Sequence, residues 1–462
     1  MLFSSPLFLF FVLPPALLLY FAAPKGLKNA ALLVASLLFY AWGEPVAVFV
    51  VLASALLDYV VAPRVTTPGP EGGRWLALGV AANVLLLFVY KYADFALDTV
   101  QPLTGPLPHL KLALPLGVSF IVFEKITYLV DLRRGESQRA RSLRDYLLFV
   151  FFFPKVLAGP IIKYHEIDDA LRERRVDWDD RAWGGLRFLW GLARKVLIAD
   201  VCGQVADRAF DPANAPMGFA GAWIGVLAFT VQIYFDFAGY SDMALGLARI
   251  FGFRLRENFA HPYGAVSFTE FWKRWHISLT TWIRSYLYIP LGGNRRGPAR
   301  TYLNLWLCFL LSGLWHGAAW TFVLWGVWHG TFMVLDRQSW WKWTERLPSP
   351  LRVAGVLALV TVGWAIFRSH GLTQLGDVLS AMARPGLEGQ FLAVRGHEAA
   401  AMAIGLLGAL IAATPQVRSL TDRAAAIPSA RAAASLVVVA LGVLAIAKAL
   451  TTTFNPFLYF RF

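Results

Sequence analysis

Apolar residues follow one another along this chain in long runs, with few polar positions inside them. The runs cover residues 4–23, 27–42, 45–62, 74–97, 114–131, 143–163, 183–206, 221–250, 300–335, 350–367, 397–414 and 430–450. A run of roughly 20 apolar residues is long enough to cross a bilayer as a helix. The pattern therefore predicts an all-α, polytopic integral membrane protein with about 11 to 13 transmembrane or re-entrant helices, some of them bent.

The composition agrees with a membrane protein. The 462 residues are 57% hydrophobic and 16% charged, whereas soluble domains hold about 25% charged residues. No repeat of fixed period is evident along the chain. We therefore expect one membrane domain, residues 1–462.

The formal net charge of +14 is concentrated between the apolar runs, with arginine clusters at 133–144, 172–175 and 295–300. Such clusters are typical of cytoplasmic loops that face anionic lipid, and a nucleotide-binding role for one cluster is the alternative. Nucleic-acid binding has no support in the sequence, because no basic, polar folded domain is evident to carry it. The longest polar interval, 163–182, predicts an amphipathic surface helix and a loop.

The sequence predicts no disulfide framework and no metal site. Its two cysteines, Cys202 and Cys308, both lie inside apolar runs, which excludes a site built from paired cysteines. His316 has neither a second histidine at a spacing of four nor an adjacent carboxylate, so a ligand set is incomplete.

Two carboxylates, Asp236 and Asp242, interrupt the run 221–250. On a helix they are separated by about 240° and point to different faces, so paired carboxylate catalysis is not expected. We expect each to accept a buried hydrogen bond or to pair with an arginine of another helix. A catalytic role is the alternative.

Two histidines in tryptophan-rich sequence are the strongest candidates for chemistry, because an ionisable side chain is costly in hydrocarbon. His276 and His316 are 40 residues apart, with a glycine-rich reversal at 291–297 between them. If both arms are mainly helical, rising roughly 1.5 Å per residue, the histidines return to a similar depth. They can then share one site.

Ordinary core packing accounts for the position of some of the histidines in this region better than for others. His276 lies one step from a helical stripe of aromatic residues in 268–286, so ordinary packing is an alternative for it. His316 lies deep in an apolar run between Gly313 and Gly317, which leave room for another backbone or a ligand. His329 is about 20 Å beyond His316 on a continuous helix, so we expect it to pack rather than react unless the chain bends.

Three segments carry a specific resemblance to a known family. They are Arg274-Trp-His-Ile-Ser-Leu-Thr-Thr-Trp-Ile-Arg284, Tyr286-Leu-Tyr-Ile-Pro-Leu-Gly-Gly-Asn-Arg295 and Ser312-Gly-Leu-Trp-His-Gly-Ala-Ala-Trp320. They resemble the signature of membrane-bound O-acyltransferases, and more narrowly the bacterial branch that includes the alginate O-acetyltransferase membrane subunit. Weaker similarities extend over nearly the whole chain. Phe123-Glu-Lys125 departs from the family pattern, in which a small polar pair is more usual.

The resemblance implies a ring of helices around a thinned central tunnel, with a cytosolic opening for acyl-CoA and an opposite opening for the acceptor. It assigns the invariant histidine of the family to His316 and the second active-site position to His276. A neutral imidazole at His316 is suited to take a proton from an attacking hydroxyl. His276 is expected to orient the acceptor or to donate to the developing oxyanion. Residues expected to line the tunnel are Trp275, Trp315, Ser312 and Arg274.

The implied activity is O-acetyl transfer in the bacterial inner membrane, with acetyl-CoA as the donor and no permanently bound cofactor. Arg295, Arg296 and Arg300 are expected to attract this anionic donor. The implied acceptor is a hydroxyl of an extracytoplasmic polysaccharide, either an alginate-like exopolysaccharide or peptidoglycan. Because this branch works with a periplasmic SGNH-type acetyltransferase and no such domain is recognisable here, we expect a separate partner.

Two other functions stay open. D-alanyl transfer to teichoic acid would require a carrier-protein donor, and the segment 291–295 resembles the acetyltransferase side more closely. A polysaccharide or lipid transporter would typically show inverted repeats or paired broken helices, which the sequence lacks. The segment 454–462 holds five aromatic residues and is a candidate docking surface for the partner, with packing or interfacial anchoring as the alternative.

Overall fold

The structure, a computed structural model, describes residues 2–213, 217–389, 392–451 and 458. These residues form helices and connecting segments without a β-strand among them, which confirms the all-α prediction. The chain divides into two compact units. Unit 1 consists of residues 1–188 and 240–256, and unit 2 consists of residues 189–239 and 257–462.

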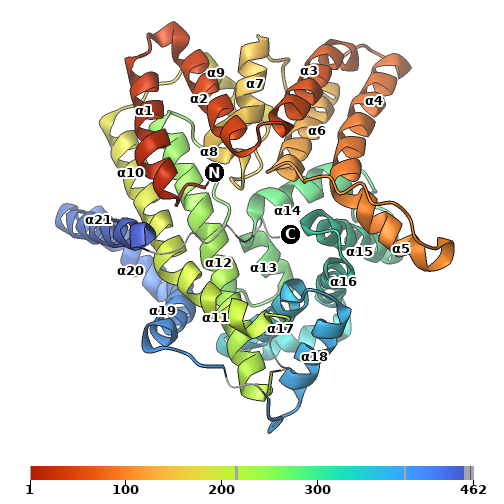
Figure 1. The fold of residues 1–462 in the computed structure, drawn as a ribbon, viewed down its shortest axis with the longest axis vertical. Coiled ribbons are helices and arrows are strands. Elements are labelled where there is room, and N and C mark those ends of the chain that lie inside the picture. The colour runs from red at the N-terminus through yellow and green to blue at the C-terminus, as the bar shows by residue number, and fades with distance from the viewer. Residues whose placement is uncertain (1, 214–216, 390–391, 452–457, 459–462) are drawn as a thin grey trace. The chain divides into compact units, whose positions relative to one another are not determined.

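Unit 1 is built mainly from the helices before residue 188, coloured red to yellow-green in Figure 1. They are η1 (Phe8–Val12), α1 (Leu13–Ala22), η2 (Lys25–Leu27), α2 (Lys28–Gly43), α3 (Ala47–Val65), α4 (Pro70–Leu87), η3 (Phe88–Tyr92), α5 (Ala93–Thr104), α6 (Val118–Arg134), α7 (Leu143–Phe151), α8 (Phe153–Val156), α9 (Tyr164–Arg172) and most of α10 (Trp178–Ala193). The end of α12 (Phe219–Ile250) also belongs to this unit.

Unit 2 holds the remaining helices. They are η4 (Arg194–Ala199), α11 (Asp200–Phe210), the first part of α12, η5 (Pro262–Gly264), α13 (Phe268–Arg274), α14 (Ile277–Ile283), η6 (Arg284–Tyr288), α15 (Gly297–His316), α16 (Trp320–Leu335), η7 (Ser339–Arg346), α17 (Ser349–Arg368), α18 (Leu372–Ala383), α19 (Gly396–Ala412), α20 (Pro415–Ala426) and α21 (Pro428–Thr451). Buried tryptophans and phenylalanines dominate its core.

Six helical segments of the described chain are long and apolar enough to cross a membrane, and a pair bent by 84°, α19 with α20, would be a seventh. The six are 25–43, 47–65, 70–104, 219–250, 349–368 and 428–451. The sequence prediction of 11 to 13 segments also counted apolar runs that are not single helices in the structure. The run 143–163 contains the separate helices α7 and α8, and the run 300–335 contains α15 and α16. Hydropathy reports apolar length but not these breaks.

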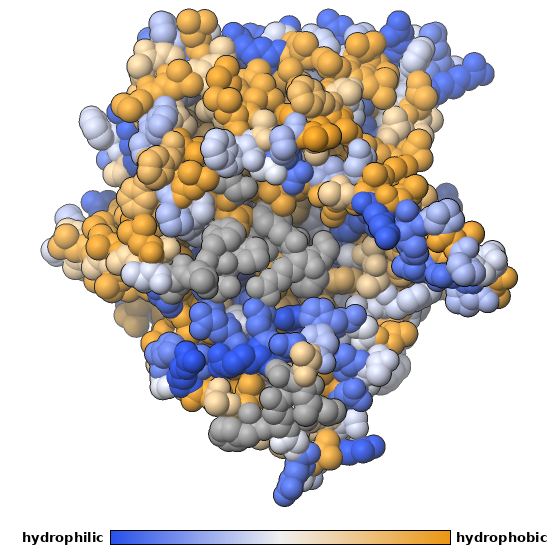
Figure 2. All heavy atoms as spheres, viewed as in Figure 1, coloured by the Kyte–Doolittle hydropathy of each residue, from blue (hydrophilic) through white to orange (hydrophobic). Residues whose placement is uncertain are grey.

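The outer surface of the early helices is apolar. Figure 2 shows hydrophobic side chains gathered over the region that α1 to α4 occupy in Figure 1. Leu38 is 66% exposed, Phe49 69% and Leu85 60%. Apolar side chains exposed around spanning helices are the expected outer face of a protein whose solvent is lipid.

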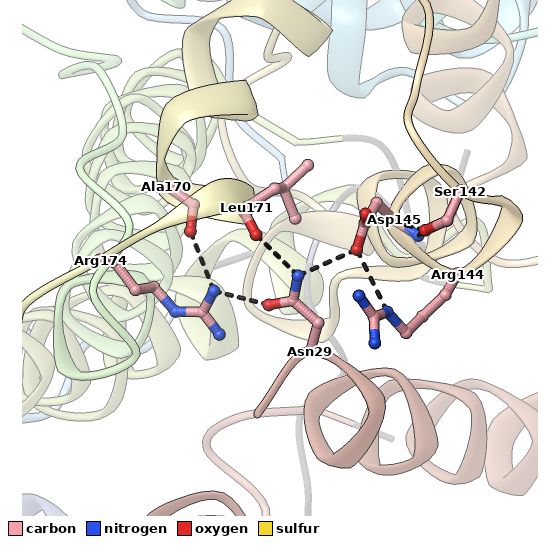
Figure 3. A network of polar contacts seen from close by, with 7 residues as sticks. All are labelled: Asn29, Ser142, Arg144, Asp145, Ala170, Leu171 and Arg174. Atoms are coloured by element: carbon pink, nitrogen blue, oxygen red, sulfur yellow. Dashed lines mark hydrogen bonds and ion pairs between the residues drawn. The ribbon is translucent and has the colours of Figure 1, made fainter. Parts of the chain in front are cut away.

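A network of hydrogen bonds connects residues of α2, α7 and α9 in unit 1 (Figure 3). The Asn29 amide donates to Asp145 Oδ1 at 2.9 Å and to the Leu171 carbonyl at 2.8 Å. Arg174 Nη1 donates to Asn29 Oδ1 at 2.6 Å. The expected amphipathic helix of the 163–182 interval is α9, and Arg174 of the arginine cluster beside it is a structural contact.

The two carboxylates of α12 are both engaged in structural contacts, as the sequence predicts. Asp236 Oδ1 lies 3.0 Å from Lys195 Nζ, and its Oδ2 accepts from the Leu458 backbone N–H at 2.8 Å. Asp242 Oδ1 lies 2.8 Å from Arg187 Nη2. Apart from Leu458, the candidate docking segment 454–462 lies outside the described residues.

Candidate active site

His276 occupies a break between two short helices. Ser267 Oγ accepts from the Glu270 N–H at 3.1 Å and starts α13, and the extended backbone of Trp275 ends it. His276 then has a φ of 44°, in the left-handed region, immediately before α14. A non-glycine residue held there stores about 1–3 kcal/mol, a feature that clusters at functional sites.

Asn258 holds this break in place. Its backbone carbonyl accepts from the Ile277 N–H at 2.9 Å. Its side-chain Oδ1 accepts from the Ser278 N–H at 3.1 Å and lies 3.2 Å from His276 Nδ1. Because the backbone N–H of Ser278 must face an oxygen, the orientation of the Asn258 amide is fixed. The Ser278 hydroxyl donates to the same Oδ1 at 3.0 Å, and a hydrogen bond from His276 to this oxygen requires the proton on Nδ1.

This tautomer determines what His276 can do. With Nδ1–H directed at Asn258, the neutral ring has its lone pair on Nε2. His276 is fully buried outside the six long spans, and burial lowers its pKa to about 3, so the ring stays neutral near pH 7. Neutral His276 is therefore a hydrogen-bond acceptor at Nε2. Of its two expected roles, orientation of an acceptor hydroxyl uses this tautomer, whereas donation to an oxyanion requires the proton on Nε2.

His316 is the last residue of α15 and is 4% exposed. The next residue, Gly317, has no room for a side chain, since a Cβ there would lie 2.0 Å from the Phe322 ring. The imidazole contacts Trp325 and Phe367, with ring centroids 5.0 and 5.5 Å away. His316 thus lies at a chain reversal enclosed by aromatic rings.

Glycines let the two helices of this reversal approach closely. A Cβ on Gly313 would lie 2.2 Å from the Phe322 carbonyl oxygen, and one on Gly326 would lie 2.5 Å from the Phe309 carbonyl oxygen. Contacts this short require bare backbone on both α15 and α16. Gly313 therefore accommodates another backbone, which is one of the two expectations from the sequence, whereas Gly317 lies against the Phe322 ring.

Trp315 connects the two histidines. Its ring centroid lies 6.0 Å from that of His276 and 5.0 Å from that of His316. The tertiary structure thus brings together side chains that are 40 residues apart in the sequence. One indole separates them, so both can face groups bound beside it.

His329 is closer to His316 than a continuous helix allows. The distance of about 20 Å assumed an unbroken helix, but α15 ends at His316 and α16 begins at Trp320. Both imidazoles contact the same indole, because the Trp325 centroid lies 5.0 Å from His316 and 4.7 Å from His329. The continuous-helix expectation is wrong, since the chain reverses at residues 317–319.

A cavity of about 750 Å³ adjoins this region within unit 2. Its exposed lining residues include Lys273, Arg284, Arg295 and Arg337, and no carboxylate occurs among the described lining residues. Its buried lining residues are Trp272, Leu279, Gly293, Leu305, Cys308, Ser312 and Met333. The cavity thus combines a cationic outer part with an apolar inner part, at a size typical of ligand sites, about 300–1,000 Å³.

The inner part of the cavity reaches the neighbourhood of both histidines. Ser312 lies one helical turn before His316 on α15, and Ile277 follows His276 directly. Lining residues therefore lie close to each histidine in the sequence, one on α15 and one at the start of α14. Within the described ranges, no group of three or more His, Cys, Asp or Glu side chains is placed to hold a metal ion.

The expected tunnel and donor residues fall into two groups. Ser312 and Arg295 form the first group, because they line the cavity. The second group is absent from the described lining residues and consists of Trp275, Trp315, Arg274, Arg296 and Arg300.

The contacts of this second group explain two of its positions. Trp275 packs in the aromatic core, 4.9 Å from Trp364 between ring centroids. Arg274 pairs with Glu270 at 2.5 Å. Both side chains are therefore engaged within the protein, beside the cavity rather than on its wall.

Sequence reasoning missed four residues that the structure brings to the site. Lys273, Arg284 and Arg337 line the cavity with Arg295, and Asn258 orients His276. The three cations come from separate segments, α13, η6 and the turn after α16, so no charge cluster marks them. Asn258 lies in an irregular segment with no periodic signal, and only tertiary contact reveals its partner.

Comparisons with known proteins identify the family of this chain. Residues 84–355 match the sequence model of MBOAT, the membrane-bound O-acyltransferase family, and this range includes both candidate histidines. The chain is 41% identical over 390 residues to the probable alginate O-acetylase of Azotobacter vinelandii, covering 83% of this chain and 78% of the relative.

More distant relatives have other acceptors in their names. The chain is 36% identical over 437 residues to the peptidoglycan O-acetyltransferase of Helicobacter pylori, covering 86% of this chain and 82% of that protein. It is 28% identical over 299 residues to the teichoic acid D-alanyltransferase of Bacillus subtilis, covering 61% and 73%. With the family match over more than half of its length and these identities over most of it, the chain belongs to the membrane-bound O-acyltransferase family.

Proposed function

We propose that this enzyme transfers acetyl from cytosolic acetyl-CoA to a hydroxyl destined for an extracytoplasmic polysaccharide. The observation that carries the proposal is the cavity of about 750 Å³, with four cations on its lining and Ser312 one turn from His316. Acetyl-CoA carries phosphates at one end and a small thioester at the other. The cationic outer part suits the phosphates, and the apolar inner part suits the thioester.

The chemistry needs one proton acceptor and one group that orients the hydroxyl. The acceptor oxygen attacks the thioester carbonyl carbon while His316 takes the hydroxyl proton. The C–S bond then breaks, the acetyl ester forms, and the thiolate of CoA leaves and is protonated. His276, held by Asn258 with its lone pair on Nε2, accepts a hydrogen bond from the incoming hydroxyl and fixes its direction.

The relatives support the choice of acyl group and narrow the acceptor. The alginate and peptidoglycan enzymes are both named for O-acetyl transfer, and the chain covers each of them more fully than the D-alanyltransferase. We infer acetyl transfer towards alginate-like exopolysaccharide or peptidoglycan, with a periplasmic SGNH-type acetyltransferase as the partner. D-alanyl transfer from a carrier protein is the second candidate, favoured only by the weaker similarity to the teichoic acid enzyme.

The proposal is tested with the purified protein in proteoliposomes and acetyl-CoA labelled in the acetyl group. We expect saturable binding, release of free CoA thiol, and label on alginate oligosaccharides or peptidoglycan fragments when an SGNH partner is added. The His316→Ala variant should bind acetyl-CoA but release thiol at least about 100-fold more slowly. The matched control is His397→Ala, because His397 is exposed and lies outside the cavity lining.

Two results would contradict the proposal. Absence of saturable acetyl-CoA binding would remove the assigned donor. Transfer from a D-alanyl carrier protein, without transfer from acetyl-CoA, would establish the second candidate instead.

A further inference from the structure

A second cavity, of about 290 Å³, lies within unit 1, and none of its lining residues is among those assigned to acetyl transfer, which belong to unit 2. Three fully or nearly fully buried polar side chains, Asp58, Asn83 and Lys125, form part of its lining. The remaining lining residues are Ser54, Leu57, Ala82, Leu85, Leu86, Val89 and Tyr90. Most of the wall is therefore apolar, and its polar groups are gathered at one place.

The polar groups of this cavity form a balanced pair. Lys125 Nζ lies 3.2 Å from Asp58 Oδ2, and the Asn83 amide donates to Asp58 Oδ1 at 2.9 Å and to Oδ2 at 3.1 Å. One positive and one negative charge cancel at this depth. A ligand with a net charge would leave an uncompensated charge in a low-dielectric medium, so the cavity favours a neutral ligand.

Asn83 supplies an acceptor that the protein itself does not use. Its amide nitrogen donates to Asp58 and to the Gly79 carbonyl at 2.9 Å, which excludes a flipped amide because an oxygen would then face acceptors. Its Oδ1 is buried and has no hydrogen-bond partner among the described residues. A buried acceptor calls for a donor, and a hydroxyl is a neutral group that donates.

Lys125 can complete the recognition of a hydroxyl. Within the described chain its ammonium donates to Ser54 Oγ and pairs with Asp58. An ammonium has three N–H donors, so one more is available for a ligand oxygen. A hydroxyl can therefore donate to Asn83 and accept from Lys125.

The position of the cavity indicates where the ligand comes from. It opens beside α3 and α4, which both belong to membrane-spanning segments, and the lining residues Leu57 and Leu85 are 41% and 60% exposed. Asp58 lies near the middle of α3, about 16 Å from its start at roughly 1.5 Å per residue. The charged headgroup of a phospholipid stays at the interface, whereas a neutral lipid can reach this depth.

We propose that this cavity binds a neutral lipid with a free hydroxyl, of the diacylglycerol type. Its hydroxyl contacts Asn83 Oδ1 and Lys125 Nζ, and its chains lie along Leu57, Leu86 and Val89. This ligand satisfies the buried acceptor, keeps the Asp58–Lys125 pair balanced, and arrives from the bilayer. Glu124 and Lys125 are the two residues that depart from the family pattern, and they have different roles. Glu124 pairs with Lys155 inside the protein, whereas Lys125 contacts the lipid hydroxyl.

The test compares two lipids on the full-length protein in detergent, without an acetyl donor. Binding of dioleoylglycerol is counted by native mass spectrometry and titrated through the unfolding temperature. The comparison lipid is dioleoylglycerol acetylated at its hydroxyl, which keeps both chains but has no donor for Asn83. We expect saturable binding of about one dioleoylglycerol, and at least roughly tenfold weaker binding of the acetylated lipid, because a buried acceptor stays unpaired.

Two variants locate the binding. Asn83→Leu removes the acceptor, and Ala82→Phe fills the cavity while leaving Asp58, Asn83 and Lys125 intact; each should weaken dioleoylglycerol binding at least about tenfold. Ala82→Phe keeps the test decisive if Asn83→Leu does not fold. The matched control is Val84→Phe, on the same helix but 51% exposed and outside the lining, which should bind normally. Equal binding of both lipids, no binding, or full binding by Ala82→Phe overturns the proposal.

Discussion

The neighbourhoods of His276 and His329 show two ways in which this protein buries an imidazole. Both side chains are fully buried. His276 lies at a helix break with a left-handed backbone, beside a cavity-lining residue. His329 lies inside the continuous helix α16, with the rings of Trp272, Trp325 and Phe268 within 5.5 Å between centroids.

The hydrogen bonding of the two imidazoles differs as well. Asn258 fixes the tautomer of His276, whereas neither ring nitrogen of His329 has a hydrogen-bond partner among the described residues. A Cβ on Gly363 would lie 2.7 Å from His329 Nε2, so α17 packs against the edge of this ring. Burial alone therefore does not identify a reactive histidine. His276 differs from His329 in its hydrogen bond to Asn258 and in its position at a helix break. A neighbouring cavity does not separate them, because Trp272, which contacts His329, is itself a lining residue.

The largest effect expected is the loss of the general base. Replacing His316 by Ala should lower the rate of acetyl transfer by about 10²–10⁴-fold, the usual contribution of a positioned acid or base. The rate is measured with labelled acetyl-CoA on protein shown to be folded by its unfolding temperature. Activity within tenfold of the unchanged enzyme would remove His316 from this role.

A smaller loss is expected when the orientation of His276 is relaxed. Asn258→Ala should lower kcat by about 10–100-fold, because the imidazole loses the partner that fixes its tautomer. Asn258→Asp keeps an oxygen acceptor and should retain more activity than Asn258→Ala. A change confined to KM for acetyl-CoA would instead place Asn258 in donor binding.

The cavity predicts which arginines contact the donor. Arg284→Gln and Arg337→Gln should each raise KM for acetyl-CoA by about twofold to fivefold, as expected for exposed charges, and added salt should have the same effect. The matched controls are Arg296→Gln and Arg300→Gln, which belong to the sequence cluster but lie outside the described lining. Equal effects at all four positions would show that net charge matters and the cavity wall does not.

The smallest effect is expected at His329. His329→Gln should lower the unfolding temperature and reduce the transfer rate by less than about tenfold, because the side chain packs on Trp325 within the continuous helix α16. Acetyl-CoA binding should be unchanged. If a folded His329→Gln variant binds acetyl-CoA but does not turn it over, the contrast with His276 fails and the chain of rings from His316 to His329 takes part in catalysis.

The sequence by itself determined the helical membrane class, the family and the two candidate histidines. Apolar runs report their own length whatever lies around them, so the all-helical class followed directly. The angular separation of Asp236 and Asp242 argued against paired catalysis, and the cost of a carboxylate in an apolar run favoured a structural partner for each. The motifs around His276 and His316 carried the resemblance, because they are contiguous segments of the sequence.

Only the tertiary structure decided how these elements meet. The reversal after His316 depends on Gly317 lying against the Phe322 ring, a contact that hydropathy does not record, and it brings His329 onto Trp325. The cations of the cavity come from separate segments, and Asn258 reaches His276 across 18 residues. Local pattern specifies which helices form, whereas side-chain contacts between distant segments specify the tautomer, the cavity wall and the neighbours of each histidine.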